Sequence, residues 1–216
     1  MNHYLLAALW TVVGAAAGFG MRRLSLWLAK LEGLESGHKI WQEYGQPVLC
    51  ALVFAAYALG IESFPLLVVR SLFVVVLVQV IFFDFEHHLI LDRVMFPSMA
   101  VALLVGVLGG TLGLWHQPWW AGIATGVGAG LLFVLFALVG WAIFKTEALG
   151  FGDVKLALFM GLLLGWPYTA SALFYGVLLA AIGAIAFIVV HRSLKGTIAY
   201  GPYLAAGALI VLLQLP

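Results

Sequence analysis

Residues 121–144 read AGIATGVGAGLLFVLFALVGWAIF, a run without a single charged side chain. About 20 apolar residues in a helix are enough to cross the hydrocarbon core of a membrane. A continuous run rich in Leu, Ala and Gly favours a helix over the alternating pattern of a membrane β-barrel. Gly122, Gly126 and Gly130 recur every four residues, a spacing that suits close packing between membrane helices. The run therefore predicts a membrane-spanning helix that packs tightly against a neighbour.

The whole chain has the composition of an integral membrane protein. Of its 216 residues, 65% are hydrophobic and only 9% are charged, whereas about 25% are charged in an average soluble domain. Apolar runs occur at about 4–21, 47–61, 65–83, 94–115, 121–144, 156–166, 168–190 and 200–215. We expect an all-α, polytopic bundle of about eight transmembrane helices in a lipid bilayer. The sixth and eighth runs are short, so seven helices or one re-entrant segment are alternatives.

Basic residues indicate how the bundle is oriented. Nine of the ten lie in the odd-numbered loops between the expected helices: Arg22, Arg23, Lys30, Lys39, Arg93, Lys145, Lys155, Arg192 and Lys195. The positive-inside rule places these loops in the cytoplasm and both termini outside. The tenth, Arg70, lies inside the third run, where snorkelling and pairing with Glu62 are both open. Because Arg22 and Arg23 follow the first run and nothing basic precedes it, we expect an uncleaved anchor there.

Two parts of the sequence have only general interpretations. The first cytoplasmic loop, about 22–45, is amphipathic and predicts either a helix on the membrane surface or a docking surface for a substrate segment. The one cysteine, Cys50, lies in an apolar run and is expected to be an inert core thiol. No zinc-binding spacing and no dinucleotide or P-loop glycine pattern occurs. We therefore expect no metal, no cofactor and no nucleic-acid partner.

The septet GFGDVKL at residues 150–156 places charge beside the membrane. An ionised Asp at a helix centre in lipid costs about 2.5–3.5 kcal/mol, so such residues are functional candidates. Gly150 and Gly152 carry no side chain that would separate Asp153 from an approaching peptide. Asp84, at the end of the third run, falls on the same predicted side. Two nearby carboxylates share a proton and can supply one general base and one general acid.

Each of these residues also has a simpler interpretation. Asp153 could be a helix cap and Asp84 a solvated loop charge. Asp92 competes with Asp84 for the role of first aspartate, although we favour it as the cap of the fourth helix. Lys155 either assists the acidic residues or snorkels to the interface. Glu86, His87 and His88 could suggest a metal site, but adjacent histidines project in different directions and no third or fourth ligand is evident. Solvation or a small electrostatic role is therefore favoured over metal binding.

Three segments together resemble type IV prepilin peptidases, which belong to the GxGD aspartyl proteases. The segment IFFDFEHHLILD at 81–92 is similar to the family's first aspartate segment, and GFGDVKL at 150–156 to its GxGD segment. The segment IAYGPYLAAG at 198–207 is similar to the Gly-Pro-aromatic start of the last helix. The likeness covers the chain from about residue 65 to its end. It divides the chain into a two-helix membrane segment, 1–61, and a GxGD peptidase bundle, 62–216.

The resemblance implies a specific activity. Asp84 and Asp153 would be the catalytic pair of an aspartic endopeptidase in the bacterial inner membrane. Supporting or substrate-binding roles would fall to the residues of the motifs: Gly150, Gly152, Lys155, Asp92, Gly201 and Pro202. The substrate would be a prepilin or pseudopilin, cleaved on the cytoplasmic face after a glycine, without metal or covalent intermediate.

The chain departs from the family pattern in two places. Leu91 stands where the family often has Pro before the second Asp of the first segment. The first cytoplasmic loop lacks the two Cys pairs of methylating members, so N-methyltransferase activity is not carried over. A proton-coupled transporter and a noncatalytic relative that binds substrate helices are the alternatives in other functional classes. The natural substrate and the oligomeric state stay open.

Overall fold

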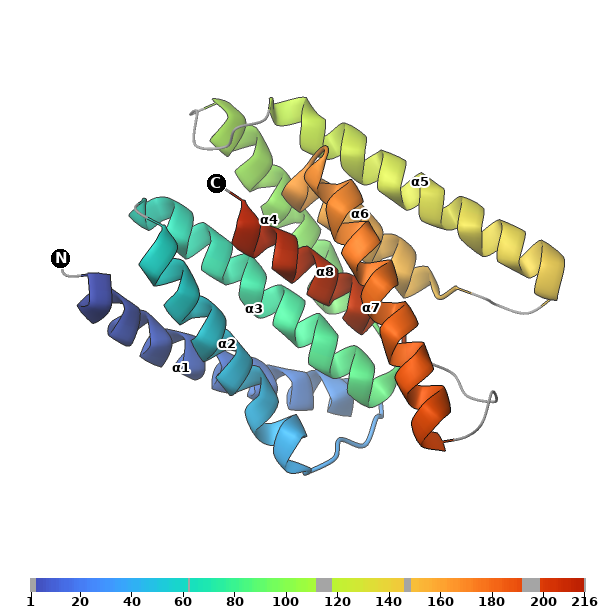
Figure 1. Ribbon diagram of the computed structural model, residues 1–216, viewed down its shortest axis with the longest axis horizontal. Coiled ribbons are helices and arrows are strands. Elements are labelled where there is room, and N and C mark those ends of the chain that lie inside the picture. The colour runs from blue at the N-terminus through green and yellow to red at the C-terminus, as the bar shows by residue number, and fades with distance from the viewer. Residues whose placement is uncertain (1–2, 62, 112–117, 146–148, 192–198, 216) are drawn as a thin grey trace. The chain divides into compact units, whose positions relative to one another are not determined.

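The computed structural model describes the chain except for residues 1–2, 62, 112–117, 146–148, 192–198 and 216 (Figure 1). The described part consists of helices and connecting segments and contains no strand. Its helices are α1 (His3–Leu31), α2 (Ile40–Gly60), α3 (Phe64–His87), α4 (Asp92–Thr111), α5 (Trp119–Phe144), α6 (Phe151–Leu164), α7 (Tyr168–His191) and α8 (Gly201–Gln214). The expected all-α fold and the helix count of about eight are confirmed.

Five of these helices have the length and hydropathy needed to cross a membrane: α1, α3, α4, α5 and α7. The helix α2 is 21 residues long, but its first turns carry polar side chains. The helices α6 and α8 have only 14 residues each, and most of their residues are buried. These two short runs are therefore helices enclosed largely by protein, and their apolar segments are shorter than the usual spanning length.

Contacts between residues divide the chain into two compact units, Met1–Leu89 and Ile90–Pro216. The first unit contains α1, α2 and α3, and the second contains α4 to α8. This division describes packing. The sequence-based division at residue 61 describes family likeness, and it stays a prediction.

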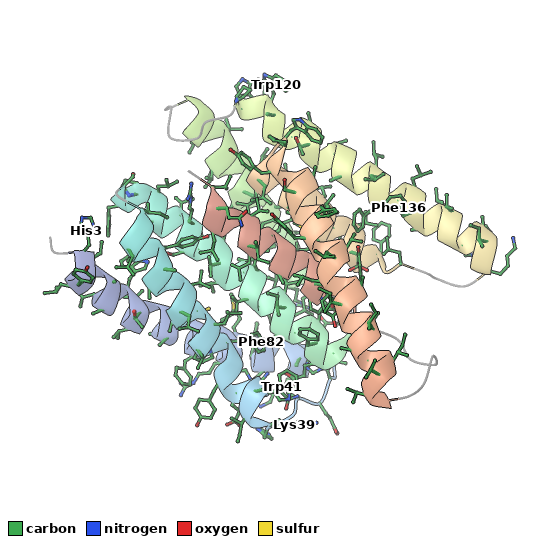
Figure 2. All side chains as sticks on the ribbon, in the orientation of Figure 1. His3, Lys39, Trp41, Phe82, Trp120 and Phe136 are labelled. Atoms are coloured by element: carbon green, nitrogen blue, oxygen red, sulfur yellow. The ribbon has the colours of Figure 1, made fainter. Side chains whose placement is uncertain are left out.

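In the first unit, small residues let α1 and α2 approach closely. A Cβ atom added to Gly14 would lie 2.7 Å from the carbonyl oxygen of Cys50, and one added to Gly18 would lie 2.7 Å from the nitrogen of Pro47. Such distances exclude any larger residue at these positions, so the two helix backbones are in direct contact. At the other face of α2, the rings of Trp41 and Phe82 pack with their centroids 6.4 Å apart (Figure 2).

The helix α1 is longer than its apolar run. It continues without a break to Leu31, so residues expected to form an interfacial segment extend the first span instead. Gly33, with φ of 70°, ends the helix. The N–H of Leu34 donates to the carbonyl of Ala29 at 2.8 Å, and the N–H of Gly33 donates to that of Lys30 at 3.2 Å. This pair of bonds is a Schellman motif, which stops α1 and turns the chain into the loop 34–39.

In the second unit, α5 and α6 pack through the glycine ladder. A Cβ atom on Gly122 would lie 2.8 Å from the carbonyl oxygen of Leu162, and one on Gly126 would lie 2.9 Å from that of Leu158. On α6, a Cβ on Gly161 would lie 2.6 Å from the nitrogen of Gly126. The close packing expected from the spacing of Gly122 and Gly126 is confirmed, whereas Gly130 makes only an ordinary contact, at 3.5 Å.

Candidate active site

Asp84 occupies the last turn of α3 and is buried, with 5% of its surface exposed. The helix ends just after it, because His88 adopts the left-handed conformation with φ of 52°. The N–H of His88 donates to the carbonyl oxygen of Asp84 at 2.9 Å and closes the final turn. The solvated loop charge considered for Asp84 is therefore not what the structure shows, because its carboxylate belongs to a buried helix end.

Glu86, two residues further on, forms a buried ion pair. Nη1 of Arg22 donates to Oε2 of Glu86 at 2.7 Å, and the two side chains are 7% and 4% exposed. The N–H of Gly37 donates to the other carboxylate oxygen at 2.7 Å, while Nη2 of Arg22 donates to the carbonyl of Gly37 at 2.9 Å. Of the two interpretations favoured for Glu86, solvation was wrong, because both of its oxygens bind protein groups inside the first unit; the small electrostatic role stays a prediction.

His87 packs into the same cluster. Its Nε2 lies 3.4 Å from Oγ of Ser36 and 4.0 Å from Oε1 of Glu86. Its ring centroid lies 4.6 Å from that of Phe83, with the two planes tilted by 51°, and its side chain is 5% exposed. Across the described residues, no three His, Cys, Asp or Glu side chains are grouped so that they could hold a metal ion.

Asp153 lies in the first turn of α6 and is 8% exposed. The capping position belongs to Gly150, whose carbonyl accepts the N–H of Asp153 at 3.1 Å. Asp153 is thus the third residue of the helix and not its cap. Its carboxylate lies where the free N–H groups of a helix start favour negative charge.

The two glycines of the GxGD segment serve different purposes. A Cβ on Gly152 would lie 3.0 Å from Cβ of Ile90, so this glycine lets α6 begin against the start of the second unit. A Cβ on Gly150 would lie 3.5 Å from Oδ2 of Asp153, which is an ordinary contact. Gly150 is also exposed. Packing therefore accounts for Gly152, and the open side of the segment is at Gly150.

Lys155 and Asp92 form an ion pair with each other. The ammonium group also lies 5.3 Å from the ring centre of Phe151 and 5.4 Å from that of Phe96. We expected Asp92 to cap α4, but the carbonyl of Leu91 accepts the first N–H bonds of that helix. The capping prediction was wrong, because Asp92 is the first helical residue and its carboxylate binds the lysine instead.

The Gly-Pro segment starts α8 close to Asp153. Gly201 and Pro202 are buried in the first turn, where Pro fits because the first N–H groups of a helix need no intrahelical partner. Tyr200 occupies the capping position. Burial raises the pKa of its phenol, and the negative charge of Asp153 raises it further. The sequence assigned no chemistry to Tyr200, and the only available signal was its position directly before the Gly-Pro pair.

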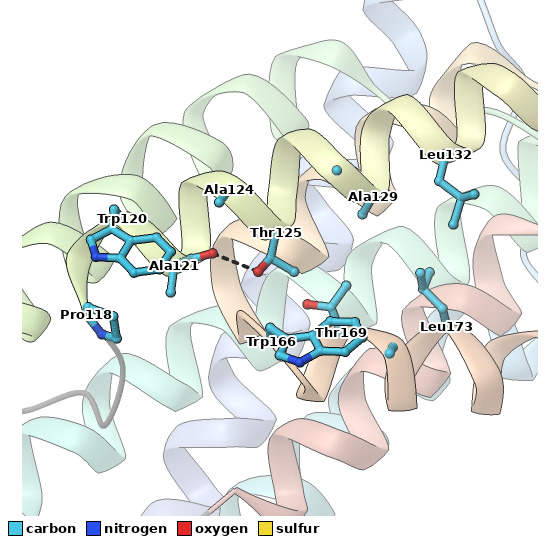
Figure 3. Close-up of a pocket in the computed structure, with 12 residues that line it drawn as sticks. Pro118, Trp120, Ala121, Ala124, Thr125, Ala129, Leu132, Trp166, Thr169 and Leu173 are labelled. Carbon is cyan, nitrogen blue, oxygen red and sulfur yellow. Dashed lines mark hydrogen bonds between the residues drawn. The ribbon is translucent and has the colours of Figure 1, made fainter.

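An apolar groove lies between α5 and α7 in the second unit, with a volume of about 770 Å³ (Figure 3). Small residues and two indoles make up most of its lining: Ala121, Ala124, Thr125, Gly128, Ala129, Thr169, Ala170, Trp120 and Trp166. The hydroxyl of Thr125 donates to the carbonyl of Ala121 at 2.7 Å, and that of Thr169 to the carbonyl of Gly165 at 2.8 Å. With its hydroxyls bonded internally and no ionisable lining residue, the groove suits apolar groups and not acid–base chemistry.

The fold defines a multi-pass membrane protein in which acidic side chains are buried near helix ends. Residues 71–185 match the Type IV leader peptidase family, and this range contains Asp84, Asp92 and Asp153. The chain is 31% identical over 178 residues to the prepilin leader peptidase/N-methyltransferase of Escherichia coli (strain K12), covering 79% of this chain and 73% of that protein. The chain belongs to the Type IV leader peptidase family.

Further relatives support the assignment. The prepilin leader peptidase/N-methyltransferase of Bacillus subtilis (strain 168) is 31% identical over 186 residues, which cover 82% of this chain and 68% of the relative. The prepilin leader peptidase/N-methyltransferase of Aeromonas salmonicida (strain A449) is 36% identical over 144 residues, which cover 64% of this chain and 46% of the relative. No solved structure matches the chain. Membership confirms the resemblance inferred from the three segments.

Proposed function

We propose that this protein is an aspartic endopeptidase of the bacterial inner membrane that removes the leader peptide from type IV prepilins or pseudopilins. The observation that carries the proposal is the family match over residues 71–185, which contains both proposed catalytic residues. The relatives named prepilin leader peptidases support the substrate class. Cleavage after a glycine and before a hydrophobic helix is part of the proposal.

In the proposed mechanism, Asp84 and Asp153 act together on one water molecule. One carboxylate removes a proton from the water as it attacks the amide carbonyl, and the other protonates the leaving nitrogen. Their low exposure, 5% and 8%, supports this role, because two carboxylates that meet away from bulk water share one proton. Asp84 belongs to the first unit and Asp153 to the second. That the two residues meet is therefore part of the proposal.

The proposed substrate route follows from the membrane and the open glycine. The hydrophobic helix of a prepilin would approach through the lipid, while its basic leader stays at the cytoplasmic surface. Gly150 is exposed beside Asp153 and leaves room for an extended peptide backbone. The proposed cytoplasmic orientation rests on the positive-inside rule; of the residues used for it, Arg192 and Lys195 lie outside the described part, as does Glu62, the suggested partner of Arg70.

The proposal covers the peptidase step and not methylation. The names of the relatives include both activities. In this chain the loop between α1 and α2 contains no cysteine, and the one cysteine, Cys50, is buried within α2. The family resemblance associates methylation with cysteine pairs in that loop.

The test is a cleavage assay with purified protein and a prepilin that carries a glycine–hydrophobic junction. We expect the wild type to cleave it, and we expect Asp84→Asn and Asp153→Asn each to lose activity by about 10²–10⁴-fold, the usual contribution of a general acid or base. Glu35→Gln, an exposed acidic residue in the first loop, is the matched control and should cleave normally. Full activity of either aspartate variant would contradict the proposed pair, and an inactive wild type would contradict the substrate class.

A further inference from the structure

Three separate segments of the first unit meet at one buried carboxylate. Arg22 comes from the C-terminal half of α1, Gly37 from the loop after it, and Glu86 from the end of α3. The two oxygens of Glu86 accept hydrogen bonds from Arg22 and Gly37, both at 2.7 Å. Arg22 closes the triangle by donating to the carbonyl of Gly37 at 2.9 Å. We call Arg22, Gly37 and Glu86 the Glu86 clamp.

The loop that contributes Gly37 is itself fixed at both ends. The Schellman motif at Gly33 sets where it leaves α1. At the other end, Oε1 of Gln42 accepts the N–H of Lys39 at 2.9 Å and starts α2. A Cβ on Gly37 would overlap the amide group of Gln42, so a larger residue would have to displace this side chain and its bond to Lys39. The conformation of the loop is therefore fixed by hydrogen bonds at both of its ends.

The clamp is fastened to the helix turn that carries Asp84. Glu86 follows Asp84 by two residues, and the carbonyl of Asp84 accepts the last turn's bond from His88 at 2.9 Å. The final carbonyl groups of a helix have no intrahelical partners, so the last turn depends on other contacts for its order. Here those contacts are the ion pair of Glu86 and the packing of His87 on Phe83 and Ser36.

We propose that the Glu86 clamp positions Asp84 for catalysis, so that Arg22 and Glu86 are positioning residues of the peptidase reaction. This inference rests on the proposed function. The clamp joins α1 and the first loop to the last turn of α3, and it fixes the direction in which the Asp84 carboxylate points.

The chemistry of the clamp separates positioning from simple stabilisation. A buried ion pair contributes little more stability than a well-packed apolar pair of the same size, yet it specifies one geometry through its hydrogen bonds. Replacing both charges with apolar side chains therefore keeps the fold while removing the directed bonds. A purely structural role and a positioning role predict different activities for that double variant.

The kinetic test compares Glu86→Gln, Arg22→Lys and the double variant Arg22→Met/Glu86→Leu with the wild type in lipid vesicles containing a prepilin substrate. We expect kcat to fall roughly 10- to 100-fold in each, as for a misplaced catalytic group, while KM changes less than about threefold. Arg23→Lys and Glu35→Gln are the controls, because both residues are exposed and lie beside the clamp in sequence. A folded double variant with wild-type kcat would overturn the proposal.

A second test does not depend on activity. Ser36→Cys places a thiol next to His87, and the native Cys50 is fully buried and so reacts slowly with maleimide. We expect Glu86→Gln to raise the labelling rate of this thiol about tenfold or more, because the loop is released from α3. Glu35→Cys, already exposed, should label at the same rate in both backgrounds.

The two tests fail in different ways. An unchanged labelling rate at Ser36→Cys in the Glu86→Gln background would overturn the clamp, whatever the protein cleaves. If labelling changes as expected but the wild type cleaves no prepilin, the proposed function is wrong and the positioning role falls with it, while the clamp stands as a loop anchor.

Discussion

The two proposed catalytic residues lie at opposite kinds of helix end. Asp84 is in the last turn of α3, where unpaired carbonyl groups point, and Asp153 is in the first turn of α6, where unpaired N–H groups point. The helix dipole therefore stabilises the ionised form of Asp153 and destabilises the ionised form of Asp84. Two identical side chains thus start from unlike electrostatic surroundings, a difference that suits one acid and one base.

The two helix ends are also held by different ion pairs. The pair Arg22–Glu86 is buried, with side chains 7% and 4% exposed, and Lys155–Asp92 is open, with side chains 19% and 55% exposed. A buried charge that loses its partner is costly, whereas an exposed pair contributes little. The end of α3 therefore relies on a buried ion pair for its geometry, whereas the start of α6 carries an exposed one.

The largest effect on stability should come from Arg22→Ala. It leaves the carboxylate of Glu86 buried without its counter-ion, and we expect the free energy of unfolding to fall by about 3–5 kcal/mol. Denaturant titration in detergent, followed by tryptophan fluorescence, measures the change. The double variant Arg22→Met/Glu86→Leu should recover most of the loss. Wild-type stability of Arg22→Ala would show that the charge is not truly desolvated.

A smaller effect is expected at the contact between α5 and α6. In Gly161→Ala the new methyl group overlaps the backbone of Gly126, so we expect a loss of about 1–3 kcal/mol, typical of overpacking. Gly128→Ala, on the same pair of packed helices, meets nothing within 4 Å and should be neutral or slightly stabilising. Thermal unfolding of the two variants side by side provides the measurement. Equal Tm values would refute the direct backbone contact.

The exposed ion pair should contribute least to stability. Lys155→Met removes the partner of Asp92 but keeps the apolar stem that lies over Phe96 and Phe151. We expect the free energy of unfolding to change by less than about 1 kcal/mol. The same denaturant titration tests this, with Lys145→Met as the control. A loss as large as that of Arg22→Ala would remove the contrast between the two ion pairs.

The last prediction concerns the electrostatic interaction between Tyr200 and Asp153. Burial and the charge of Asp153 both raise the pKa of the phenol. Because the phenol has a higher pKa in the folded protein than in the unfolded chain, its neutral form contributes fully to stability at any pH below the ordinary pKa near 10. This contribution is lost as the pH rises through the higher pKa of the folded protein. Asp153→Asn should therefore lower the titration midpoint of Tyr200, read as tyrosinate absorbance relative to Tyr200→Phe. An unmoved midpoint would show that the two groups do not interact.

Much of the fold follows from patterns that are local in sequence. Apolar runs predict membrane helices because lipid offers no partner for backbone groups. The spacing of Gly122 and Gly126 predicts close packing because glycine alone permits contact between helix backbones. Both predictions are confirmed. Buried positions for Asp84 and Asp153 could also be expected, because each lies at the end of an apolar run.

What could not be predicted depends on residues far apart in the chain. Arg22 and Glu86 are separated by 64 residues, and nothing in either segment identifies the other as its partner. The same holds for Lys155 and Asp92, 63 residues apart, whose pairing displaced the expected cap. The end of α1 was missed for another reason. Hydropathy falls at Arg22, but the helix continues to Leu31, and one face of this extension is buried against protein at Ser25, Leu28 and Ala29.

The short length of α6 has a consequence for the membrane itself. Its 14 residues extend about 21 Å, roughly 9 Å less than the hydrocarbon core. Trp166, exposed just after this helix, is the kind of residue that settles among lipid headgroups. If Trp166 lies at one headgroup layer, a helix of this length places the turn that holds Asp153 inside the opposite one. Because α6 is largely enclosed by protein, water would have to reach this turn along the protein, and its access would limit the proposed hydrolysis.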